Sequence, residues 1–238
     1  MFLGHYAVAF AAKRAAPRTS LGVLVLAAEW LDEIWPVFLL LGWERVRIVP
    51  GLMAASPMDF EHYPISHSLL LVLGWSALLG LAYFALRRYR RGAWVVALVV
   101  ASHWVLDLLV HRPDLPLWPG GPRLGLGLWN SLPATVVLEL GFFGAGLWIY
   151  FRFTRALDRI GSWGAWAMAA LLLVIYVASS FGPPPPDARR VAVASLALWI
   201  FVPWGWWVDR HREVRGDLAA ANPAAARTTS PVPHQFPS

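Results

Sequence analysis

Long apolar runs separated by short polar segments dominate the chain. Each run is close to the roughly 20 residues that an α-helix needs to cross about 30 Å of hydrocarbon. Arg-rich or Pro-containing segments separate the runs, and such segments end helices and avoid the bilayer interior. The pattern therefore predicts an all-α, polytopic membrane helix bundle. We expect six transmembrane helices, near 20–41, 68–86, 92–110, 131–151, 161–181 and 190–208.

The two ends of the chain differ from this pattern. The opening MFLGHYAVAFAAKRAAP predicts a shorter helix that Pro17 ends, tucked into the bundle as a half-length helix. It lacks the basic start and the small-residue cleavage site of a signal peptide. We therefore divide the chain into a membrane-embedded bundle carrying a metal site (1–151), two further transmembrane helices (152–215) and a disordered cytoplasmic tail (216–238).

The basic residues favour one orientation in the membrane. With both termini in the cytoplasm, inner segments carry fourteen basic residues and outer segments carry six, which is the bias of positive-inside topology. The net charge of +6 is then topological, and nucleic acid is not an expected partner. We expect an integral protein of a bacterial-type plasma membrane, with its site toward the outer face. The six outer residues are Arg45, Arg47, Arg112, Arg123, Arg189 and Arg190.

Ionisable residues inside the apolar runs are the candidate chemistry. In SHWVLDLLVHRPDLPLWP, His103, Asp107 and His111 are four residues apart and share one helix face. An ionised carboxylate at mid-bilayer costs about 2.5–3.5 kcal/mol on insertion scales. No Lys or Arg lies inside the first, third and fourth predicted spans, which carry these residues, to neutralise it. Such acids must be protonated, line water or face a cation.

Depth along the helices groups these residues. Counting about 1.5 Å of rise per residue from the nearest inner Lys or Arg places them roughly 12–24 Å above it, converging in the outer half of the membrane. Imidazole and carboxylate without cysteine suit Zn²⁺, with Mn²⁺ or Fe²⁺ as alternatives, bound as one or two ions. The candidate metal ligands are His5, Asp32, His62, His67, His103, Asp107, His111 and Glu139.

Two of these ligands carry a further expectation. Glu139 is a candidate metal ligand or general base, and Glu139 and Asp107 are the candidate catalytic groups. The alternative interpretation of Glu139 is a protonated acid that bonds to a neighbouring helix. His111 lies about 12 Å along the helix axis from His103. It can join His103 on one ion only if the helix breaks before Pro113, and otherwise serves a second ion or a substrate.

Several of these motifs together resemble the YdjM-like family of membrane-bound metal-dependent hydrolases. The matching elements are Gly4 with His5, the His-x4-His-Ser of His62, His67 and Ser68, the Ser-His-x3-Asp of Ser102, His103 and Asp107, and an exit like Pro-Leu-x-Trp-Pro at Pro116, Leu117, Trp118 and Pro119. The family's Leu-Pro-Asp-x-Asp is replaced by EWLDEIWP, which puts its acidic ligand on Asp32 with an altered register. That family is distantly similar to zinc-dependent phospholipase C and P1-type nucleases, which implies a phosphoester substrate.

The sequence thus favours a metal-dependent hydrolase, expected to use zinc, that acts on a lipid head group or another ester or phosphoester from the outer face. Its expected partners are membrane lipid and a small-molecule or lipid substrate. One alternative is a transporter or ion- or proton-handling protein, since buried acids also form conduction paths. Another is a non-catalytic scaffold whose buried acids only lock helices together. A conduction path needs polar residues at both depths, whereas the inner halves of the predicted spans have few.

Overall fold

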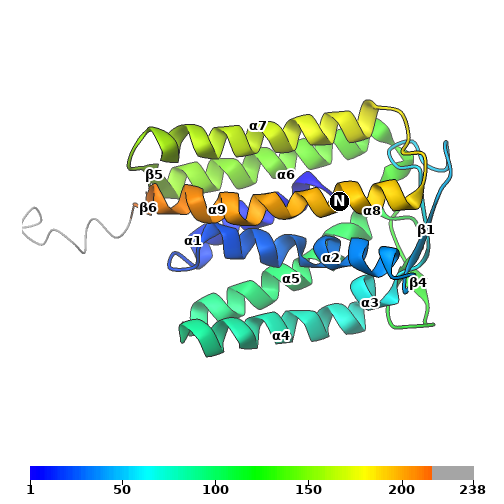
Figure 1. Ribbon diagram of the computed structural model, residues 1–238, viewed down its shortest axis with the longest axis horizontal. Coiled ribbons are helices and arrows are strands. Elements are labelled where there is room, and N and C mark those ends of the chain that lie inside the picture. The colour runs from blue at the N-terminus through cyan, green and yellow to red at the C-terminus, as the bar shows by residue number, and fades with distance from the viewer. Residues whose placement is uncertain (216–238) are drawn as a thin grey trace, which may run out of the picture.

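The chain folds into a bundle of helices that run along one long axis, seen here in a computed structural model that describes residues 1–215 (Figure 1). The predicted class, an all-α helical bundle, is confirmed. The tail expected to be disordered, 216–238, lies outside the described residues. Short antiparallel strand pairs are found at both ends of the bundle.

The helices follow the apolar runs closely. α1 (Leu3–Ala15) ends just before Pro17, as expected for the half-length helix. α3 (Pro64–His67) is a single turn just before the start of α4. The long helices are α2 (Leu21–Leu40), α4 (Leu69–Arg87), α5 (Arg90–Val110), α6 (Leu132–Phe153), α7 (Arg159–Phe181) and a run made of α8 (Ala188–Leu196), the 3₁₀ turn η2 (Ala197–Ile200) and α9 (Phe201–Arg210).

Within residues 1–215, five helical segments rather than the expected six are long and apolar enough to cross a membrane: α4, α5, α6, α7 and the run from α8 to α9. The exception is α2, which has 20 residues but carries Glu29, Asp32 and Glu33. It packs against α1, α5, α8 and α9. Glu29 and Glu33 are each only 1% exposed, so these two carboxylates of α2 face protein.

Glycines allow the interior helices to approach closely. A Cβ at Gly146 of α6 would lie 2.4 Å from the backbone oxygen of Ala7 in α1. Gly22 of α2 and Gly205 of α9 face each other in the same way, since a Cβ at Gly205 would lie 2.9 Å from the Cα of Gly22. Small residues at such crossings are typical of membrane bundles. They hold α1 and α2 in the centre, where the candidate site lies.

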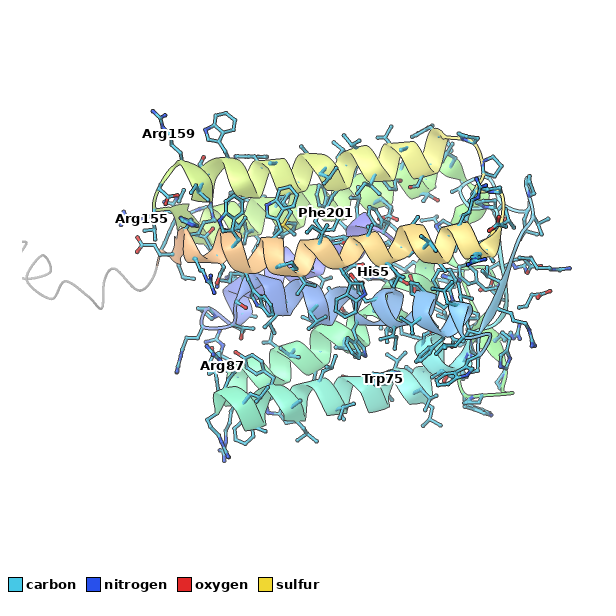
Figure 2. All side chains as sticks on the ribbon, viewed as in Figure 1. His5, Trp75, Arg87, Arg155, Arg159 and Phe201 are labelled. Atoms are coloured by element: carbon cyan, nitrogen blue, oxygen red, sulfur yellow. The ribbon has the colours of Figure 1, made fainter. Side chains whose placement is uncertain are left out.

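The two ends of the bundle differ in charge and in structure. Figure 2 shows Arg87, Arg155 and Arg159 at one end, near β5 (Thr154–Ala156) and β6 (Arg212–Val214). The other end carries β1 (Arg45–Ile48) paired with β2 (Met58–His62), β3 (Leu115–Pro116) paired with β4 (Arg123–Leu124), and the 3₁₀ turn η1 (Leu128–Asn130). Large apolar side chains such as Leu81 and Val137 are exposed on the sides of the helix bundle, as in an integral membrane protein.

Candidate metal centre

Asp107, near the end of α5, lies at the centre of a cluster of ionisable side chains. It is 2% exposed, and its Oδ2 lies 3.2 Å from Nε2 of His103, which is fully buried one turn earlier. A spacing of four residues on a helix brings both side chains to one face. α5 therefore supplies two donor atoms to one point by local geometry alone.

Two other elements bring donors to the same point. His67 ends α3, and its Nε2 lies 3.4 Å from Oδ1 of Asp32 in α2 and 3.7 Å from Oδ2 of Asp107. Oδ1 of Asp32 is in turn 3.7 Å from Nε2 of His103. Four donor atoms from α2, α3 and α5 thus close a ring with separations of 3.2–3.7 Å.

These separations suit ligands that share a central ion. Tetrahedral zinc bonds of about 2.0–2.1 Å place any two donor atoms about 3.3 Å apart, a value that the four adjacent pairs of this ring approach. A direct N–H···O hydrogen bond is most often about 2.9–3.0 Å long. Asp32, His67 and His103 form one group of donors within 4.8 Å of one another, and His5, His103 and Asp107 form a second. The cluster could therefore hold a metal ion.

His5 approaches the other oxygen of Asp107. Its Nε2 lies 3.1 Å from Oδ1, and its ring stacks on that of His103 with centroids 3.6 Å apart. The residue is 1% exposed in the interior of the bundle (Figure 2). The amino group of Met1 bonds the same Oδ1. The two carboxylate oxygens of Asp107 thus face different partners.

A hydrogen bond at Nδ1, the ring nitrogen that points away from the cluster, fixes the orientation of His103. Its Nδ1 lies 2.7 Å from the carbonyl oxygen of Ala28 in α2, which can only accept a hydrogen bond. Nδ1 therefore carries a proton and bonds the backbone, and Nε2 is the nitrogen that faces Asp107 and Asp32. Nε2 is buried and has no hydrogen-bond partner among the described residues. This is the arrangement of a metal-binding imidazole.

His67 is fixed by a relay that reaches Glu44. Nδ1 of His67 donates to Oγ of Ser66 at 2.7 Å, and Ser66 donates to Oε2 of Glu44 at 2.6 Å. Oε1 of Glu44 accepts the backbone N–H groups of Ile65 and Ser66 at 2.7 and 2.8 Å. Sequence reasoning missed Glu44, because nothing in the stretch GWERVRI marks a partner 22 residues away. Its 1% exposure shows that it is part of the site's support.

The helix that carries His103 breaks before Pro113, which is the condition under which His111 could approach the same ion. α5 ends at Val110, and His111 has extended backbone angles. Its Nδ1 donates to Oδ1 of Asp114 at 2.9 Å, and its Nε2 lies 4.0 Å from Oδ2 of Asp107. Tyr63 also donates to Asp114, at 3.2 Å. Burial, and then the Asp114 carboxylate, raise the pKa of Tyr63 well above its usual value, so its phenol remains a donor.

Glu139 lies beside the cluster and caps α1. Its two oxygens accept the backbone N–H groups of Phe2 and Gly4 at 2.8 and 2.9 Å. A carboxylate at a helix N-terminus satisfies donors that the helix leaves free. Glu139 belongs to neither donor group but lines the cavity described below. Its expected role as ligand or base stays a prediction.

The structure separates His62 from the other candidates. His62 is exposed at the end of β2, opposite Arg45 of β1, and belongs to neither donor group. The sequence placed it near the cluster because it lies only five residues before His67. The extended strand and the turn at Tyr63 direct it away.

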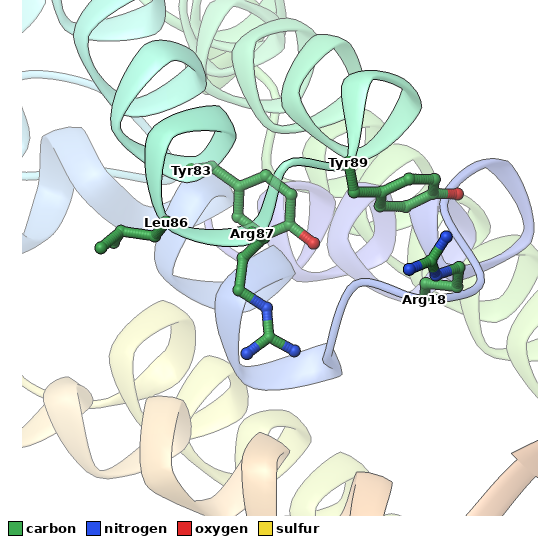
Figure 3. Close-up of a pocket in the computed structure, with 5 residues that line it drawn as sticks. All are labelled: Arg18, Tyr83, Leu86, Arg87 and Tyr89. Atoms are coloured by element: carbon green, nitrogen blue, oxygen red, sulfur yellow. The ribbon is translucent and has the colours of Figure 1, made fainter.

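A cavity of about 530 Å³ opens onto the cluster. Asp32, His67, Asp107, His111 and Glu139 line it at the cluster, and α7 and α8 line its other walls. A second pocket of about 210 Å³ lies at the Arg-rich end (Figure 3). Its lining, which is Arg18, Tyr83, Leu86, Arg87 and Tyr89, offers no carboxylate or imidazole. The first cavity is therefore the one that can bring a ligand to the donors.

Comparison with known proteins finds no matching family model, no similar curated protein and no similar solved structure. The resemblance drawn from the sequence motifs stays a prediction, and the function has to be argued from the site itself.

Proposed function

We propose that this protein is a membrane-embedded hydrolase that depends on a divalent metal ion and acts on a phosphoester or ester at the membrane surface. The observation that supports the proposal best is the ring formed by His67, Asp32, His103 and Asp107, with donor separations of 3.2–3.7 Å. These four side chains are the proposed ligands. A set of two imidazoles and two carboxylates without thiolate favours Zn²⁺, with Mn²⁺ or Fe²⁺ next.

Charge supports a bound cation. Among residues 1–215, no Lys or Arg side chain pairs with Asp32 or Asp107; Asp107 meets histidines and the Met1 amino group, and Asp32 meets histidines alone. Burying carboxylates without full compensation costs several kcal/mol. A divalent ion among the four donors would neutralise both acids. It would also give the buried Nε2 of His103 a partner.

Hydrolysis needs a water, a proton acceptor and a site for the leaving group. The ion would polarise a water molecule and the substrate's ester group. In phosphoester hydrolysis the water oxygen bonds to phosphorus, the ester P–O bond breaks, one water proton goes to a base and the leaving oxygen takes up a proton. His111 suits the base, because Asp114 holds its Nδ1 and because the residue lines the cavity and belongs to neither donor group.

One observation favours a second candidate, a proton- or cation-handling protein. Both carboxylate oxygens of Glu29 are buried without a hydrogen-bond partner among the described residues, and Glu29 lies deeper along α2 than Asp32. Buried acids in membranes often belong to proton paths. Glu29→Gln separates the candidates: it would abolish such transport, whereas the hydrolase would keep its metal and its turnover.

The first experiment measures metal content by mass spectrometry on detergent-purified protein. The wild type is compared with His103→Ala/Asp107→Ala and, as a matched control, with His62→Ala, since His62 lies outside the cluster. Size-exclusion chromatography confirms that each variant is folded. We expect metal in the wild type and in His62→Ala, and none in a folded double variant.

Metal-dependent hydrolysis is then tested on a soluble phosphodiester and on phospholipid vesicles. Wild-type protein that binds no metal after dialysis against Zn²⁺ or Mn²⁺ would overturn the metal site and the hydrolase together. Metal without turnover of either substrate would leave a metal-binding protein and overturn the hydrolase alone.

A further inference from the structure

The cavity at the metal centre extends between two helices for which the proposed reaction has no use. One wall is the face of α7 that carries Ile175, Tyr176 and Ser179. The opposite wall is formed by Ala194 of α8 and, one turn on, by Leu198 of the 3₁₀ turn η2. Figure 1 shows α7 and the start of α8 separating toward the outer end of the bundle. The two helices therefore enclose a space that connects with the cluster.

This space opens sideways. Ser179 and Ala194 line the cavity and are also exposed, although both lie on helices of membrane-spanning length and composition. Loop residues such as Ser56 and Pro57, with Pro183 of the linker before α8, line the outer end. An opening between two spanning helices faces lipid rather than water. A ligand can thus enter from the bilayer.

The polarity of the lining changes along the cavity. Carboxylates and imidazoles stand at the cluster, whereas Ile175, Val191 and Leu198 make the walls apolar. Arg190 is the one Lys or Arg in the lining, its side chain is 75% exposed, and its nearest carboxylate, that of Asp187, is 3.8 Å away. Ligand sites combine apolar walls with a few placed polar groups. This one suits an amphiphile with an anionic head.

Size limits how such a molecule would sit. A volume of about 530 Å³ holds a head group and the first part of a chain, but not a whole two-chain lipid. The rest of the lipid has to stay in the bilayer. The opening between Ser179 and Ala194 provides that route.

We propose that the substrate is a phosphate-bearing membrane lipid that enters sideways between α7 and α8, with its head group at the cluster and its acyl chain leaving past Ser179 and Ala194. The proposal rests on the proposed hydrolase function and specifies its substrate class. Arg190 then attracts the anionic head at the entrance. The last two membrane-spanning segments hold the substrate in addition to completing the bundle.

The entrance is tested without catalysis. Protein in nanodiscs is exposed to phosphatidic acid carrying a photoreactive diazirine on its acyl chain, and labelled residues are mapped by mass spectrometry. We expect labelling of the cavity wall at Tyr176, which is 4% exposed and closed to the surrounding lipid. Ala194→Trp should remove that labelling, whereas Val193→Trp, one residue away, exposed and outside the lining, should not. Labelling confined to outward residues such as Val174 would overturn the proposal.

Turnover distinguishes this proposal from the proposed function. Ala194→Trp should lower hydrolysis of phosphatidic acid by at least about tenfold relative to Val193→Trp and leave a soluble phosphomonoester unaffected. Equal loss on both substrates, or loss on neither, would overturn lateral entry while the hydrolase stands. Cavity labelling without turnover of any ester would overturn the hydrolase and leave a lipid-binding cavity.

Discussion

At the scale of single residues, His103 can bind at most one ion through its imidazole ring. Both donor groups use His103, and its Nδ1 already bonds Ala28, so only Nε2 is free. One ring nitrogen binds one ion. The ion that His103 binds can complete its set with His67, Asp32 and Asp107, which leaves His5 beside the second oxygen of Asp107 as a supporting partner.

His5→Ala should therefore keep the metal, with an affinity loss below about tenfold, the lower end of the effect of outer-shell partners. His67→Ala should lose the metal, because one of the four proposed ligands is gone. A chelator-competition titration measures both affinities. Two equivalents in the wild type and one in His5→Ala would contradict the single-ion site.

The relay behind His67 gives a second residue-scale prediction. Ser66→Ala removes the acceptor that holds Nδ1 of His67 and should weaken metal binding by about 10–100-fold. Ser68→Ala is the matched control, since Ser68 is equally buried two residues on but its Oγ bonds nothing among the described residues. The same titration compares the two. Equal affinities would show that the relay through Glu44 does not orient the ligand.

At the scale of elements, the crossing of α1 and α6 positions His5 and Glu139. Gly146 allows this crossing because a Cβ there would meet backbone atoms of Ala7, which cannot move aside as a side chain tip can. Gly146→Ala should destabilise the protein by about 1–3 kcal/mol, the usual effect of overpacking. Gly144→Ala, where a Cβ meets nothing within 4 Å, should be neutral. Thermal unfolding in detergent checks the pair, and equal midpoints would refute the close crossing.

Elements were predictable from the sequence where local rules decide them. Apolar length and flanking Arg or Pro place each long helix, and the four-residue spacing places His103 beside Asp107. The strands β1 and β2 were not foreseen, so the position of His62 at the end of β2 was not either. Glu44 and Asp114 support imidazoles through tertiary contacts, which no local periodicity reveals.

At the scale of the whole molecule, the site links elements that are distant in the chain. Its four donor atoms come from α2, α3 and α5 and meet only in the folded protein. An ion bound there would therefore stabilise the folded state and not the unfolded chain. At a free-ion concentration of 100 times the dissociation constant, the bound metal should add about 2.7 kcal/mol to the free energy of unfolding of the wild type, and removing the metal should lose this amount. EDTA should therefore lower the unfolding temperature of the wild type and leave that of His103→Ala/Asp107→Ala unchanged. An equal response of both proteins would place the metal effect elsewhere.

Orientation in the membrane decides which compartment the site serves. The Arg-rich end lies opposite the loops that close the cavity, so positive-inside topology predicts that those loops face outward. The chain has no cysteine, and single exposed positions can therefore be labelled one at a time. In intact cells, a membrane-impermeant maleimide should label Ala54→Cys in the loop between β1 and β2, and should label Leu157→Cys only after permeabilisation. The reverse pattern would turn the site, and the leaflet that supplies its lipid, toward the cytoplasm.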